Sequence, residues 1–260
     1  MTDVDTAPPP GATAPTFRRL EVADLSAALA DGWADFRRAP QFGVFFAAVY
    51  VVMGLAIVWA LAETGQFWWI IPAAFGFPLL APFIATGLYE VSRRLGTGEA
   101  LDWGAILRAP GRHGNGQIPA LAALMVVFFM MWLVVARVVL AVFQGTGSLP
   151  NVTQSLWSLV TPEGITLILI GGAMGAVIAF VLFATQFVSL PMLLDRDIDF
   201  VTAMIASVTL VRENLAVSLR WAVIIAVLTM VAMIPAFLGL FIVLPVLGHA
   251  TWHLYRRAIA

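Results

Sequence analysis

The sequence contains no cysteine and no lysine, so all 14 basic residues are arginine. Without a thiol the chain can form no disulfide, thiolate metal site or iron–sulfur cluster, and a cysteine nucleophile is excluded. Charged residues are also scarce, at 11%, where an average soluble domain has about 25%. Hydrophobic residues make up 61%, and the mean hydropathy is +0.95. This composition excludes an ordinary soluble fold and predicts a protein of the lipid bilayer.

Motifs for the commoner chemistries are missing as well. The sequence has no GxxxxGK[ST] phosphate loop, no GxSxG elbow and no HExxH zinc motif, so nucleotide hydrolysis and the usual hydrolase mechanisms lack their residues. Its arginines are scattered rather than gathered in a basic run, which argues against a nucleic-acid partner. We predict no catalytic residue and no cofactor, and the composition itself indicates one partner, the lipid bilayer.

Six apolar segments of membrane-spanning length follow one another along the chain. They are residues 42–62, 67–89, 118–142, 164–194, 221–236 and 237–255. Each predicts a helix, because lipid leaves the backbone groups of a spanning segment no partner outside it. We therefore predict an all-α, polytopic membrane bundle of six transmembrane helices in a single domain, residues 17–260. A Pro-, Ala- and Thr-rich tail, residues 1–16, is predicted to be disordered.

Arginine flanks these segments on one side only. Thirteen of the 14 arginines lie before the first segment, between the second and third, between the fourth and fifth, or after the sixth. The loops on the opposite side contain only two charged residues, Glu63 and Glu163. Positive residues favour the cytoplasmic side of a membrane. The sequence therefore predicts a multi-pass protein of the bacterial inner (plasma) membrane with both termini in the cytoplasm.

An amphipathic segment precedes each odd-numbered span. LADGWADFRRAP (residues 29–40) precedes the first, LDWGAILRAP (101–110) the third and FVTAMIASVTLVREN (200–214) the fifth. Apolar residues recur at helical spacing in the first and last of these segments. We predict three elbow helices in the membrane interface, and a threefold repeat in which each unit is one elbow helix plus one transmembrane hairpin.

The even-numbered spans share a second pattern, because each contains a proline followed by polar residues at fixed offsets. Aligning Pro82, Pro191 and Pro245 brings Arg93 and Arg94 onto Arg256 and Arg257. Positions four and eight after a proline share one helix face. In the three spans these positions hold Thr86, Glu90, Asp195, Asp199, His249 and His253. We predict that the six residues converge in one polar cluster near the cytoplasmic interface.

This predicted cluster has two interpretations. His249 and His253 have the i, i+4 spacing of a divalent metal site and would have carboxylates beside them. The favoured interpretation is a hydrogen-bonded cluster at the helix ends, with Arg93, Arg94 or Arg196 as partners, because a bare pair of histidines is a weak metal signal. We assign no metal.

Two further features lie inside predicted spans. Arg137 is the one arginine within a span, and intramembrane charge marks a functional candidate. Its position near the outer end favours a structural ion pair with Glu63 or Glu163 over a transport role. Gly171 and Gly175 form a small-xxx-small pattern that predicts close helix packing within the bundle, with oligomerisation as the second use.

Several stretches resemble an uncharacterised bacterial integral membrane protein family, domain of unknown function 2189. They are GWADFRRAP, GLYEVSRRL, TPEG, SLPMLLDRDIDFVTAM and LPVLGHATWHLYRR, and together they extend over most of the chain after the tail. The resemblance implies a membrane protein with no established activity. Some members carry a cytochrome-oxidase label, but the three histidines of this chain are too few for a haem–copper core.

Three functions are compatible with these features. The leading hypothesis is a non-catalytic accessory, scaffold or assembly factor of another membrane protein complex, because catalytic candidates are few and interfacial helices are prominent. A small-solute or ion transporter is the alternative, since prolines interrupt helices that end in polar residues. A membrane-embedded metal-binding protein is third. The sequence favours a protein that is not an enzyme.

Overall fold

The computed structural model describes residues 16–64, 70–111, 117–144 and 162–259. Apart from one antiparallel bridge between Phe17 and Ile259, the regular structure in these ranges is helical, which confirms the all-α part of the prediction. Almost all of the predicted disordered tail lies outside the described residues. The prediction of a single domain over residues 17–260 stays a prediction.

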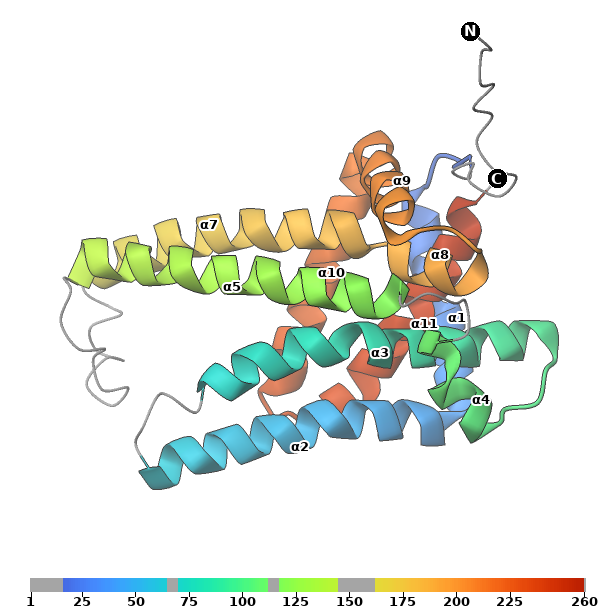
Figure 1. Cartoon of the computed structure of the whole chain (residues 1–260), viewed down its shortest axis with the longest axis horizontal. Helices are drawn as coiled ribbons and strands as arrows, with labels where there is room; N and C mark the ends of the chain where they lie inside the picture. Colours follow the sequence, from blue (N-terminus) through green and yellow to red (C-terminus); the bar gives the residue numbers. More distant parts are fainter. Residues whose placement is uncertain (1–15, 65–69, 112–116, 145–161, 260) are drawn as a thin grey trace, which may run out of the picture.

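Four long helices run side by side along the longest axis of the molecule (Figure 1). They are α2 (Pro40–Thr64), α3 (Ile70–Thr97), α5 (Gln117–Gln144) and α7 (Pro162–Gln186), and successive members contact one another. They correspond to the first four predicted spans. A shorter hairpin, α10 (Leu215–Met233) and α11 (Leu240–Ala258), corresponds to the last two.

The short helices gather at one end of the bundle, which we call the elbow end (Figure 1). They are α1 (Val22–Arg38), α4 (Trp103–Leu107), α8 (Ser189–Asp195) and α9 (Phe200–Glu213), and a 3₁₀ turn at Ala109–Gly111 follows α4. Aspartates begin two of them: the Asp102 carboxylate accepts the backbone N–H of Ala105 at 2.8 Å, and Asp199 accepts that of Thr202 at 2.9 Å. All three predicted elbow segments are therefore helical, but α4 is much shorter than residues 101–110.

Both described chain ends also lie at the elbow end (Figure 1). The Arg18 N–H donates to the Ala258 carbonyl at 2.9 Å, and the Leu20 N–H donates to the Asn214 side-chain oxygen at 2.7 Å. These bonds hold the start of the described chain against the end of α11 and the α9–α10 junction. The N- and C-terminal regions therefore lie on the same side of the bundle.

Four helical stretches in the described residues are long and apolar enough to cross a membrane. They are Pro40–Ala60, Gln117–Val135, Leu169–Asp195 and Leu215–Met233. Only 17% of the second and fourth stretches is buried inside the protein, so most of their apolar surface is free to face lipid. A multi-pass membrane fold follows, whereas the number six and the threefold repeat stay predictions.

The fourth predicted span, residues 164–194, is not one continuous helix. Helix α7 ends at Gln186 and α8 begins at Ser189. Pro191 accounts for the break, because a proline ring conflicts with the carbonyl four residues earlier, here that of Phe187. The buried Ser207 hydroxyl of α9 donates to the Ala184 carbonyl at 2.7 Å and accepts the Val188 N–H at 3.2 Å. An elbow helix thus satisfies the backbone groups that the break releases.

The largest buried cluster lies at the elbow end, where α8, α9, α10 and α11 meet. Trp221, Tyr255 and Leu210 are fully buried there. Farther along the bundle, aliphatic side chains are exposed, as at Val142 and Leu169. The protein is therefore packed as a globular core at one end and as lipid-facing helices at the other.

Candidate functional site

Helix α11 is the element on which the polar residues of the elbow end meet. Its last ten residues include His249, His253, Tyr255, Arg256 and Arg257, and these side chains contact three other helices. The sequence singled out the two histidines and the arginine pair. Their partners are described below, helix by helix.

Helix α1 packs directly on α11. A Cβ atom at Gly32 would lie 2.6 Å from the Val246 carbonyl oxygen and 2.7 Å from the Ala250 nitrogen, so only glycine permits this backbone approach. His253 Nε2 lies 2.7 Å from the Asp35 carboxylate, and Arg257 forms an ion pair with Asp31. The two pairs lie one turn apart on both helices and fix the register of α1 on α11.

Asp35 is the buried member of this junction, at 5% exposure. Burial raises its pKa, but hydrogen bonds with His253 and Ser92 and the field of the two histidines outweigh burial, and the pKa lies below the ordinary value of 3.8. Asp35 is therefore ionised at neutral pH. A buried carboxylate held in this way positions the histidine that contacts it.

Helix α3 contacts α11 through the other histidine. His249 is fully buried, and its Nδ1 lies 2.8 Å from the Ser92 hydroxyl oxygen. Beside it, a Cβ atom at Gly248 would lie 2.6 Å from Leu88 Cδ1, so these helices also approach closely. His249, Ser92 and Asp35, which are buried, and the partly buried His253 thus form one polar chain across α3, α11 and α1.

Glu90 lies on α3, two residues before Ser92, and is fully buried. Its carboxylate accepts Arg93 Nε at 2.7 Å and Arg94 Nε at 2.6 Å, both from its own helix. Arg93 also bonds Glu99 at 2.6 Å, and this hydrogen bond lowers the pKa of Glu99 to about 2. Thr86 is buried one turn before Glu90. Glu90 therefore holds two arginines of α3, and these arginines bind the segment that follows the helix, Arg93 through Glu99 and Arg94 through the Ala100 carbonyl.

The two predicted aspartates are placed differently. Asp195, at the end of α8, accepts the Tyr255 hydroxyl at 2.8 Å and Arg256 at 3.2 Å, and so joins α8 to α11. Asp199 caps α9, and hydrogen bonds from Thr202 lower its pKa. The structure thus joins Asp195 to α11, the helix that carries both histidines, whereas Asp199 caps its own helix.

The sequence analysis missed the residues that complete this network: Asp31, Asp35, Ser92 and Tyr255. One signal was present, since Asp31 and Asp35 are spaced i, i+4, as are His253 and Arg257. Two such pairs on facing helices match in charge and spacing. The pairing itself joins positions more than 200 residues apart, and nothing local indicates it.

The predicted intramembrane features are only partly described. Arg137 lies in α5, but its side chain is outside the described residues, so its ion pair with Glu63 or Glu163 stays a prediction. A Cβ atom at Gly175 would lie 3.1 Å from the Trp132 ring of α5, and one at Gly171 would lie 3.8 Å from Val139. Gly175 therefore accommodates an indole from the neighbouring helix.

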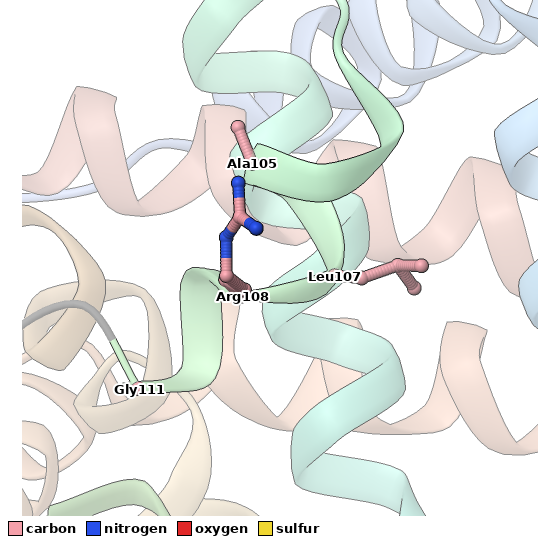
Figure 2. Close-up of a pocket in the computed structure, with 4 residues that line it drawn as sticks. All are labelled: Ala105, Leu107, Arg108 and Gly111. Atoms are coloured by element: carbon pink, nitrogen blue, oxygen red, sulfur yellow. The ribbon is translucent and has the colours of Figure 1, made fainter.

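A hollow of about 540 Å³ lies beside α4 at the elbow end (Figure 2). It is lined by Ala105, Leu107, Arg108 and Gly111. Figure 2 shows the Arg108 side chain running back along α4 towards Ala105, while Leu107 points to the other side. None of the predicted site residues lines this hollow. Within the described ranges, no three His, Cys, Asp or Glu side chains are arranged to hold a metal ion.

Part of the chain matches a known protein family. Residues 70–195 match a family model described as "Predicted integral membrane protein (DUF2189)". The matched region runs from the start of α3 to the end of α8 and includes Glu90, Ser92 and Asp195. No curated protein and no solved structure matches the chain. The predicted family resemblance is confirmed over this region, and so is the class of integral membrane protein.

Proposed function

We propose, from the premise that the chain is an integral membrane protein matching that family, that it is a non-catalytic accessory or scaffold protein of a membrane complex in the bacterial inner membrane. The elbow end faces the cytoplasm in this proposal, because the arginines around α1, α3, α9 and α11 follow the positive-inside rule. Hydrogen bonds and ion pairs join the helices at that end. They favour a rigid scaffold over an open substrate-binding site.

The proposal rests mainly on the small residues exposed on the outward face of α7. Gly172, Ala173 and Ala176 are exposed there, and a Cβ atom at Gly172 would meet no atom within 4 Å. Gly172 and Ala176 are four residues apart, the spacing that lets a second membrane helix approach closely. Gly175, in contrast, faces Trp132 within the bundle. We infer that the outward face binds a transmembrane helix of another protein.

Two matched variants test this inference. Gly172→Leu adds a side chain in open space and should leave the fold intact, but it should remove partners that co-purify after mild solubilisation. Gly172→Ala is the control and should retain them, because alanine keeps the surface small. Gly175→Leu should instead lower the stability of the isolated protein. A wild-type protein that is always purified alone, or partners that survive Gly172→Leu, would contradict the proposal.

Transport is the second candidate, because α7 is interrupted at residues 187–188, and broken helices form the sites of many transporters. The break lies near the elbow end rather than at mid-membrane, which is why transport ranks second. Flux through proteoliposomes distinguishes the two functions. If the protein is a transporter, Arg137→Ala should change the flux without lowering the yield.

A further inference from the structure

We propose that α10 and α11 form a re-entrant hairpin. It enters the bilayer from the elbow end, turns within the hydrocarbon and returns, so that its tip binds lipid acyl chains. The tip is residues 234–239, between the two helices. Helix α10 has the length and composition of a span, so length alone does not decide the matter. The depth in the bilayer at which the hairpin turns decides whether it spans the membrane.

The tip lies beside the middle of α2. A Cβ atom at Gly54 would lie 3.0 Å from the Phe237 ring, and Val51 shares a buried cluster with Ala232 and Leu240. Gly54 follows the start of the apolar segment at Phe42 by about 18 Å of helix, at 1.5 Å per residue. Beyond Gly54, α2 continues for about 14 Å before it reaches its first charged residue, Glu63.

The other long helices extend past this level. Figure 1 shows the turn between α10 and α11 ending well short of the far ends of α2, α5 and α7. If those helices cross a hydrocarbon core of about 30 Å, the tip lies inside it rather than at the far interface. The hairpin therefore reaches only part of the way across.

The backbone of the tip is suited to a place without water. Ile234, Ala236, Phe237, Leu238 and Leu240 each donate their N–H to a carbonyl of the same turn, at 2.9–3.2 Å, and Pro235 has no N–H to satisfy. Ala236 and Phe237 adopt left-handed conformations, with φ of 50° and 65°, which reverse the chain while keeping these bonds. Unsatisfied backbone groups cost several kcal/mol in lipid, and these five hydrogen bonds lower that cost.

The side chains of the tip indicate the same environment. Residues 230–248 contain no polar side chain, yet Ile234 is 80% exposed and Leu238 is 55% exposed. The sequences that join the other two hairpins differ, since ETGQ (63–66) and QGTGS (144–148) are polar. A loop that reached water would gain from such residues, whereas a tip surrounded by acyl chains gains from their absence.

Single cysteines test the inference directly, because the natural chain has none. Leu238→Cys and Ile234→Cys are placed at the tip, with Glu63→Cys as the control at the far end of α2. In membranes, a membrane-impermeant maleimide should label Glu63→Cys from one side only. It should label neither tip variant from either side until the membrane is dissolved in detergent. Labelling of a tip cysteine from either side of an intact membrane would overturn the proposal.

A spin label on the same cysteines separates lipid from a protein partner. If acyl chains surround the tip, the nitroxide at position 238 should collide often with oxygen and rarely with a water-soluble nickel complex. Low collision with both reagents would show that protein covers the tip, and frequent collision with nickel would show water. Either of these two results would overturn the assignment to lipid. The two tip variants check each other, so a folding defect in one leaves the test intact.

Discussion

Removal of the Asp35 carboxylate is the substitution that tests the α1–α11 junction most sharply. In Asp35→Ala, His253 and Ser92 lose their partner in a place that is 5% exposed. Loss of one member of a fully buried pair costs about 3–5 kcal/mol. The His253 side chain is 22% exposed, so we expect a smaller loss, about 2–3 kcal/mol, in the range of hydrogen bonds to charged groups.

Asp31→Ala is the matched control, because it removes the neighbouring carboxylate from the same face of α1. The Asp31 side chain is 44% exposed, and exposed ion pairs contribute about 0–1 kcal/mol. Thermal unfolding in a mild detergent gives the comparison. At about 2–4 °C per kcal/mol for a chain of this size, Asp35→Ala should lower the Tm by roughly 4–12 °C, and Asp31→Ala by much less. Equal Tm values for the two variants would refute the reasoning.

The contribution of Asp35 to stability should depend on pH in a predictable direction. The pKa of Asp35 is lowered in the folded protein, so its contribution is complete at neutral pH. As the pH falls below the ordinary value of 3.8, the unfolded chain takes up the proton first, and the contribution is lost as the pH approaches the folded pKa. The Tm difference between the natural protein and Asp35→Ala should therefore shrink in acid. A difference that grows in acid would contradict the assignment.

Four other substitutions have expected outcomes in the same unfolding assay. Gly32→Ala should destabilise the protein, because its Cβ would meet the α11 backbone at 2.6 Å, whereas Gly96→Ala, with no atom within 4 Å, should stabilise α3 by about 0.5–1 kcal/mol. Ser207→Ala should cost about 2–3 kcal/mol, since two buried hydrogen bonds at the α7–α8 break are lost; an unchanged Tm would contradict that role. Tyr255→Phe should lower the free energy of unfolding by about 0.5–1.5 kcal/mol, because the hydrogen bond to Asp195 is lost. The same substitution should cost less in a protein that already carries Asp195→Asn.

Much of the helical framework follows from local patterns in the sequence. The apolar segments and the amphipathic segment 200–214 predict helices close to those observed, because hydrophobic length and periodicity are local properties. The prolines predicted interrupted helices, but the sequence did not place the break between α7 and α8 within the predicted span 164–194. Whether a proline kinks or interrupts a helix depends on what satisfies the freed groups, and here that residue is Ser207, from another helix.

The sequence predicted which polar residues lie at the elbow end, but it did not predict their partners. Glu90, Asp195, His249 and His253 are in place near the helix ends, yet His253 contacts Asp35 of α1, and Asp199 caps α9. Helical spacing shows which residues share a face, but the facing helix depends on the tertiary fold. The close approach at Gly32, which brings α1 onto α11, has no signature beyond the glycine itself.

For this multi-pass membrane protein, the location of the elbow end in the cytoplasm is the proposal to test first. Compartment-sensitive reporters fused at Gly147 and after Ala260 measure it directly, because the two positions follow α5 and α11, at opposite ends of the predicted bundle. We expect a cytoplasmic signal after Ala260 and an external signal at Gly147. The same compartment at both positions, or the reverse assignment, would contradict it.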